Sequence, residues 1–123
     1  MAIEHDKAWP EQLRVSADRR TLNVRFADGR SCELEAELLR VRSPSAEVQG
    51  HSPDQRVTVA GKADVTISNV LPVGNYAVRL VFDDGHDTGI FTWKFLSETG
   101  ETKDEVWAGY IAELAEKGLS RTA

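Results

Sequence analysis

The sequence contains few of the residues that build covalent cross-links or membrane spans. Cys32 is the only cysteine among 123 residues, which excludes an intramolecular disulfide and a paired-cysteine metal motif. No run approaches the roughly 20 apolar residues that a membrane-spanning helix needs, and no apolar run near Met1 has the pattern of a secretory signal. We therefore expect a cytoplasmic protein in a reducing compartment, with no membrane partner.

Positive charge is also in short supply. The chain holds 20 acidic and 15 basic residues, for a formal net charge of -5. Nucleic-acid binding needs clustered lysine and arginine, so we expect no nucleic-acid partner. The local exception is the arginine-rich start of the chain, with Arg14, Arg19, Arg20, Arg25, Arg30, Arg40 and Arg42. On strands these side chains would form a solvated face, and a role as an interaction surface stays open.

The motifs of common catalytic sites are missing as well. There is no Gly-x-Ser-x-Gly nucleophile elbow, no phosphate-binding loop and no Gly-x-Gly-x-x-Gly fingerprint. A His-x-Asp or His-x-Glu pair, which could begin a non-haem iron facial triad, is also absent. Cys32 falls at an inward-facing strand position, where we expect it to pack as a small core residue. The sequence therefore predicts no enzyme activity.

Alternating apolar residues predict antiparallel hairpins. Residues 22–26 and 76–82 alternate between apolar and polar side chains, and each run leads into an Asp-Gly turn, at Gly29 and Gly85. The stretch 24–29 also aligns with 80–85, so each half is predicted to hold a strand, a turn, a strand and a short helical turn. The expected fold class is α+β, with a pseudo-duplicated antiparallel β-meander, short helical turns and one C-terminal amphipathic helix.

The last helix has the clearest boundaries. Thr102 and Glu105 have the spacing of a capping box, and Gly118 is a natural C-terminal stop. The apolar stripe between them consists of Val106, Trp107, Tyr110, Ile111 and Leu114. We expect this helix to lie across the sheet. The predicted organisation is a flexible lead-in over 1–8, a domain over 9–97, and the helical segment 98–123 packed on that domain.

The segment 43–62 is the natural place to look for a site. It carries about twenty residues without sustained periodicity, and such loops inside compact domains are often functional. Its His51 and the hairpin residue His86 could bind a metal with nearby carboxylates. The candidate ligands are His51, Asp54, Asp84, His86 and Asp87. The alternative is that the aspartates are there because turns favour them and that His86 caps or packs.

Several separated motifs resemble one family. They are Trp9-Pro10, Leu-Arg-Val at 13–15, Leu-Leu-Arg-Val-Arg-Ser-Pro-Ser-Ala-Glu-Val-Gln-Gly-His at 38–51, Pro-Val-Gly-Asn-Tyr-Ala-Val at 72–78, and Asp-Gly-His-Asp-Thr-Gly-Ile-Phe-Thr-Trp at 84–93. Over residues 9–97 the chain resembles the gamma-butyrobetaine hydroxylase-like N-terminal domain, whose free-standing bacterial members have no known function.

The resemblance implies less chemistry than the family name indicates. In the carnitine-pathway dioxygenases the similar domain precedes a catalytic barrel and holds a structural zinc with three cysteines and one histidine. The matching positions here are Ser43, Ser45, Val48 and His86, so we expect no such zinc site. The 123 residues include no catalytic barrel, so hydroxylase activity is not carried over. Similar domains are fused to iron–sulfur cluster carrier ATPases, which implies an accessory role near iron–sulfur or metal metabolism.

Two functional hypotheses follow. The first is a non-catalytic accessory domain that binds a protein partner and no cofactor. Its candidate contact residues are Arg40, Arg42, His51, His86 and Trp93. The second is an iron-binding protein that uses the histidines and aspartates given above. For His86 we expect hydrogen bonds to the 43–48 segment, which would do by polar contact what zinc does in the relatives.

Overall fold

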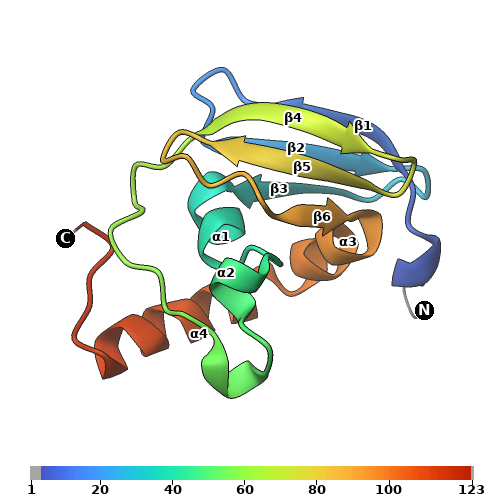
Figure 1. Cartoon of the computed structure of the whole chain (residues 1–123). Helices are drawn as coiled ribbons and strands as arrows, with labels where there is room; N and C mark the ends of the chain where they lie inside the picture. The colour runs from blue at the N-terminus through green and yellow to red at the C-terminus, as the bar shows by residue number, and fades with distance from the viewer. Residues whose placement is uncertain (1–3, 123) are drawn as a thin grey trace.

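The computed structural model describes residues 4–122, apart from the side chain of Pro53. Three strands followed by a helix occur twice along the chain, and a longer helix closes it (Figure 1). The elements in chain order are η1 (His5–Lys7), β1 (Pro10–Val15), β2 (Thr21–Phe26), β3 (Ser31–Glu35), α1 (Ala36–Val41), α2 (Ala46–Gln49), η2 (Pro53–Gln55), β4 (Ile67–Val73), β5 (Ala77–Phe82), β6 (Ile90–Thr92), α3 (Trp93–Glu101) and α4 (Lys103–Glu116).

The strands form two antiparallel three-stranded sheets, with the orders β1-β2-β3 and β4-β5-β6. The predicted α+β class and the duplicated plan are confirmed, although the strands do not join into one sheet. Gly29 and Gly85 close the matching hairpins at φ 93° and 90°, the left-handed region that glycine tolerates best. No described helix is both long and apolar enough to cross a membrane.

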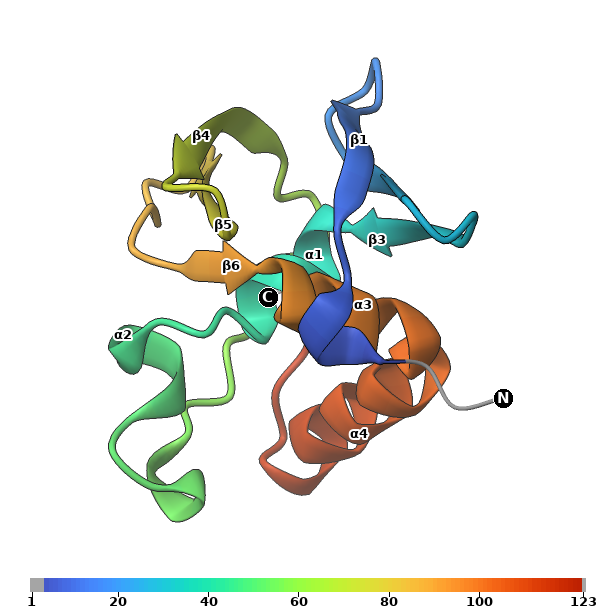
Figure 2. The same ribbon diagram turned by 90° about the vertical axis from the view of Figure 1, so that its right-hand side faces the viewer.

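The core lies between the two sheets because each sheet is apolar on one face. Figure 2 shows the sheets diverging, with α1 and α3 packed beneath them. The middle strands β2 and β5 supply matching residues from the two repeats: Leu22, Val24, Phe26, Val78, Leu80 and Phe82 are all at most 3% exposed. Cys32 is only partly buried and packs against this cluster. The outer face of each sheet is therefore left for polar side chains.

The predicted capping box of the last helix is wrong. The short helical turn expected at the end of the second half is in fact the nine-residue helix α3, which runs from Trp93 to Glu101. Thr102 therefore sits between two helices, at φ -108° and ψ 19°, and its side chain caps no described amide. Its hydroxyl instead donates to the Glu98 carbonyl at 2.9 Å. The helix α3 also spans the boundary that the sequence placed between residues 97 and 98.

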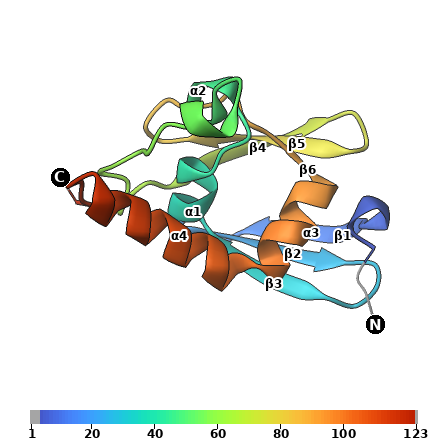
Figure 3. The ribbon, with the colours of Figure 1, turned by 90° about the horizontal axis from the view of Figure 1, so that it is seen from below.

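Helix α4 docks beside α1 rather than across a sheet (Figure 3). Tyr110 and Leu114 are buried with Val41 at the end of α1, while Ile111 from the predicted stripe is 38% exposed. The Tyr110 hydroxyl donates to the Val59 carbonyl at 2.6 Å. The helix thus holds the segment that follows η2 against the rest of the domain.

The described part of the lead-in also makes contacts. Residues 1–3 of the predicted flexible stretch lie outside the described residues. In the following 3-10 helix, Nδ1 of His5 lies 2.7 Å from the Ser97 hydroxyl and Nε2 lies 2.7 Å from the Glu101 carboxylate. This short helix is therefore placed on α3.

Candidate functional site

The buried environment of His86 accounts for the first group of candidates. Its Nε2 lies 3.0 Å from the Ser43 hydroxyl and 3.3 Å from that of Ser45. Its Nδ1 lies 3.1 Å from a Glu47 carboxylate oxygen. Because Nδ1 faces a carboxylate, it carries the proton of the neutral ring, and Nε2 accepts from a serine hydroxyl. The predicted polar link between the hairpin and the 43–48 segment is confirmed.

The electrostatics keep this ring neutral. Burial lowers the pKa of His86, the Arg40 guanidinium lowers it further, and Glu47 opposes that shift. Sequence reasoning missed Glu47, and the signal available was its place between two positions that match family zinc ligands. The backbone is also close, since a Cβ on Gly89 would stand 2.3 Å from the Ser43 hydroxyl oxygen. The contact therefore depends on a glycine at that position.

Carboxylate, imidazole and hydroxyl here follow the order found in serine hydrolases. Ser43, however, is 0% exposed, and a nucleophile has to reach its substrate. The contacts of His86 with Ser43, Ser45 and Glu47, called the His86 clamp below, therefore hold the hairpin to the 43–48 segment and take no part in a reaction. Nor do its donors fit zinc, because the positions of the family's cysteines supply two hydroxyls and the buried methyl groups of Val48.

The proposed iron ligands are not gathered. Residues 4–122 contain no group of three or more His, Cys, Asp or Glu placed to hold a metal ion. Asp84 is held by Arg40 and Lys62, each at 2.7 Å. Burial would raise the pKa of Asp84, but hydrogen bonds from Lys62, the His86 amide and Arg40 outweigh it and bring the pKa to about 2. His51 is exposed on the turn before η2.

The remaining partner candidates do not form one surface. Arg42 is 8% exposed and its guanidinium is bound by the Glu113 carboxylate of α4. The indole N–H of Trp93 donates to the Asn75 carbonyl at 2.8 Å, which ties α3 to the β4–β5 turn. With Arg40 and His86 also engaged internally, the exposed His51 and the half-buried Trp93 are what is left of the predicted contact set.

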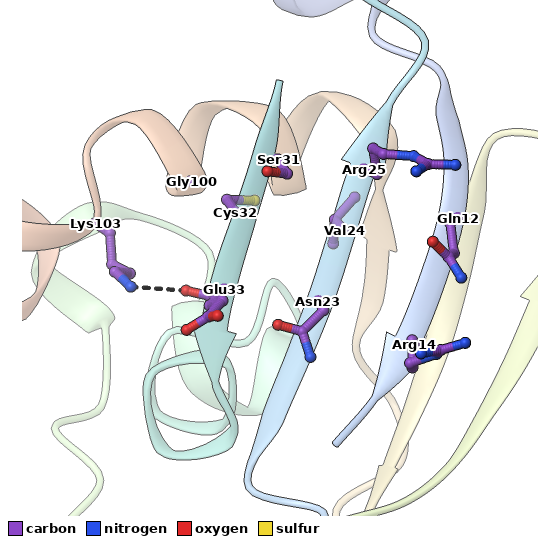
Figure 4. Close-up of a pocket in the computed structure, with 10 residues that line it drawn as sticks. All are labelled: Gln12, Arg14, Asn23, Val24, Arg25, Ser31, Cys32, Glu33, Gly100 and Lys103. Atoms are coloured by element: carbon purple, nitrogen blue, oxygen red, sulfur yellow. Dashed lines mark hydrogen bonds between the residues drawn. The ribbon is translucent and has the colours of Figure 1, made fainter. Parts of the chain in front are cut away.

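A different surface has unengaged polar groups. The outer face of the β1-β2-β3 sheet forms an open hollow of about 680 Å³ (Figure 4). Its lining consists of Gln12, Arg14, Asn23, Val24, Arg25, Ser31, Cys32, Glu33, Gly100 and Lys103. Gln12 faces Arg25 across the β1–β2 ladder, and Arg14 faces Asn23. Strand alternation therefore brings two amide and two guanidinium groups together on one face.

One of the two arginines without a polar partner among residues 4–122 lies on this face. Within residues 4–122, Arg14 and Arg79 are the arginines that make neither an ion pair nor a side-chain hydrogen bond, and Arg79 lies on the other sheet. Arg25 has one contact, 3.5 Å from Glu11. The side chains of Gln12 and Asn23 likewise make no hydrogen bond with a described residue. The alternating arginines predicted as a solvated face include the two that line this hollow.

Comparison with known proteins places this duplicated α+β fold in a family. The model described as "Gamma-butyrobetaine hydroxylase-like, N-terminal" matches residues 13–97. The chain belongs to this domain family.

Solved structures agree with that placement. Two solution NMR structures are similar to the chain: one is 48% identical, covers 93% of this chain and 90% of its own, and has a TM-score of 0.79. The other is 43% identical, with 98% and 90% coverage and a TM-score of 0.81. A crystal structure of a DUF971-family protein of unknown function from Acidithiobacillus ferrooxidans is 42% identical, with 71% and 86% coverage and a TM-score of 0.58. No curated protein matches.

Proposed function

We propose that the chain is a non-catalytic accessory domain that binds a protein partner in the cytoplasm through the outer hollow of the β1-β2-β3 sheet. The observation that carries this proposal is the set of polar side chains in the hollow that have no internal partner. Within residues 4–122, each buried or half-buried charged side chain outside the hollow has an ion-pair partner, although Nη1 of Arg40 makes no hydrogen bond. Donors left unpaired on one concave face are available for a partner instead.

The His86 clamp supports the non-catalytic part of this proposal. The constellation closest to a catalytic one, around His86, has its Ser43 hydroxyl fully buried. The similar domains fused to iron–sulfur cluster carrier ATPases indicate where to look for the partner. We propose that it acts in iron–sulfur or metal metabolism.

The test is affinity capture from the native host with matched variants. Arg14→Ser combined with Arg25→Ser removes both guanidinium groups from the hollow, and Arg79→Ser removes an exposed arginine from the other sheet. We expect a partner that wild type and Arg79→Ser retain and the double variant loses, at low and moderate salt. An unchanged set of captured proteins, or none above background for wild type, would contradict the proposal. Metal analysis of the same samples tests the alternative iron site, for which we expect no stoichiometric iron.

A further inference from the structure

Resting on this proposed function, we infer that the occupant of the hollow is an extended acidic segment of the partner, which adds as a strand to the free edge of β1. Its residues would alternate between acidic side chains over the hollow and apolar side chains toward the core. Strand addition of this kind draws affinity from backbone hydrogen bonds and specificity from alternate side chains.

The backbone of β1 is available for such pairing. β1 lies at the edge of its sheet, and the Ser16 amide donates to the Thr21 carbonyl at 2.9 Å. Hydrogen-bonded pairs alternate along an antiparallel ladder, so Arg14 also faces β2 with its backbone, while Leu13 and Val15 direct theirs away. Neither of these outward residues has a backbone hydrogen-bond partner on that side within residues 4–122.

The other sheet edges are less open. At β3, the Lys103 amine donates to the Glu33 carbonyl at 2.8 Å. Helix α3 also stands close to β3, because a Cβ on Gly100 would meet the Cys32 sulfur at 2.7 Å. Pro72 interrupts the donors of β4, and β6 has three residues. β1 begins with Pro10 and has a register shift between Pro10 and Gln12, so residues 13–15 form the regular part of its free edge.

Both faces of β1 fit the proposed alternation. Toward the core, Leu13 and Val15 are partly exposed although they pack on the main cluster. Apolar side chains on an added strand would cover them. Toward the hollow, an added strand would set its side chains about 4.5–5.5 Å from Gln12 and Arg14, measured between Cβ atoms. Apolar residues on one side and polar residues on the other are what this geometry selects.

The charges that line the hollow determine which polar side chains the added strand would place there. The hollow is lined by three cationic side chains, of Arg14, Arg25 and Lys103, and by one carboxylate, of Glu33. Glu11 lies 3.5 Å from Arg25 and Glu35 lies 3.3 Å from Lys103, so Arg14 is the lining cation that has no carboxylate partner among residues 4–122. An added strand with glutamates at alternate positions would supply the carboxylate that Arg14 lacks.

A second copy of the chain fits this edge less well. In an antiparallel β1–β1 pair centred on Leu13, Arg14 faces Gln12 of the other copy. In a pair centred on Arg14, the two guanidinium groups face each other, which is unfavourable. Neither register places a carboxylate opposite Arg14.

The inference is tested by NMR titration of the full chain with the peptide acetyl-Thr-Glu-Val-Glu-Val-Glu-Thr-amide. One control peptide has glutamine in place of glutamate, and another is N-methylated at alternate residues, so that it keeps its charge but loses strand donors. We expect shifts at the amides of Leu13 and Val15, weaker binding of both controls, and a dissociation constant raised about 1.4- to 5-fold by Arg14→Ser. Arg79→Ser is expected to leave it unchanged.

Each contrary result overturns a named part of the inference. Equal binding of the glutamine peptide would remove acidic recognition, and equal binding of the N-methylated peptide would remove strand addition. No binding by any peptide, or self-association of the chain through β1 measured by sedimentation, would remove the proposed occupant. If captured partners still depend on Arg14 and Arg25, the proposed function stands without this inference. If they do not, the proposed function itself fails.

Discussion

Replacing His86 with alanine tests the His86 clamp, which joins the second hairpin to the 43–48 segment. The ring contacts the hydroxyls of Ser43 and Ser45 at 3.0 and 3.3 Å, and Glu47 at 3.1 Å. Ser43 is fully buried, and without the ring its hydroxyl keeps the longer contacts with Ser45, at 3.3 Å to the hydroxyl and 3.4 Å from the amide. Each hydrogen bond lost with the ring costs about 0.5–1.5 kcal/mol, and the packing of the ring against Phe82 is lost as well. We therefore expect the unfolding free energy to fall by about 2 kcal/mol.

Urea unfolding at pH 7.5 measures the free energy, and amide exchange measures the local effect. The amides of Val48 and Gln49 donate to the Ser45 carbonyl at 3.1 and 2.9 Å, so their protection should fall in His86→Ala. His51→Ala is the matched control, since that histidine is exposed and an exposed substitution changes stability by about 0.5 kcal/mol or less. Equal stability and equal protection in the two variants would refute the clamp.

Three further predictions concern the same framework. The folded pKa of His86 is lowered from 6.5, so the unfolded chain binds more protons than the folded chain. The contribution of His86 to stability is therefore complete above pH 6.5 and should be lost as pH falls through the folded pKa. Unfolding free energies measured against pH for wild type and His86→Gln check this. Gly89→Ala should destabilise by about 1–3 kcal/mol through its clash with Ser43. Gly109→Ala in α4, whose Cβ would lie at an ordinary contact distance of 4.0 Å from Nη2 of Arg42, should stabilise by about 0.5–1 kcal/mol; thermal unfolding of both variants would show opposite signs. Tyr110→Phe should cost about 0.5–1.5 kcal/mol by removing its hydrogen bond to a loop carbonyl, and an unchanged melting temperature would contradict that.

Local patterns predicted the hairpins well because their causes are local. Alternation places Val24 and Leu80 inward, and a positive φ after aspartate selects Gly29 and Gly85. The capping box failed for a reason of the same range. Thr102 has Glu105 at the spacing that a capping box needs, but helix α3 runs to Glu101, the residue before it, and the backbone of Thr102 is at φ -108° and ψ 19° rather than extended. A short motif does not reveal how far the element before it extends.

The candidate site was predicted less completely. The interaction of His86 with the 43–48 segment followed from matching positions, while Glu47 and the engagement of Arg42 by Glu113 did not. Arg42 and Glu113 are 71 residues apart, and no local pattern relates residues at that separation. For the same reason the sequence could not separate the internally paired arginines from those facing the hollow.

The sequence by itself determined the α+β class, the duplicated plan and the turn glycines. Each of these depends on residue type and near-neighbour spacing, which any conformation of the chain retains. The absence of the cysteine ligands was implied only by the resemblance to the family. The tertiary structure alone decided that the strands form two sheets, that His86 pairs with Glu47, and that Gln12, Arg14, Asn23 and Arg25 share an open face. The physical reason is that the availability of a polar side chain depends on which distant groups folding brings within hydrogen-bonding reach.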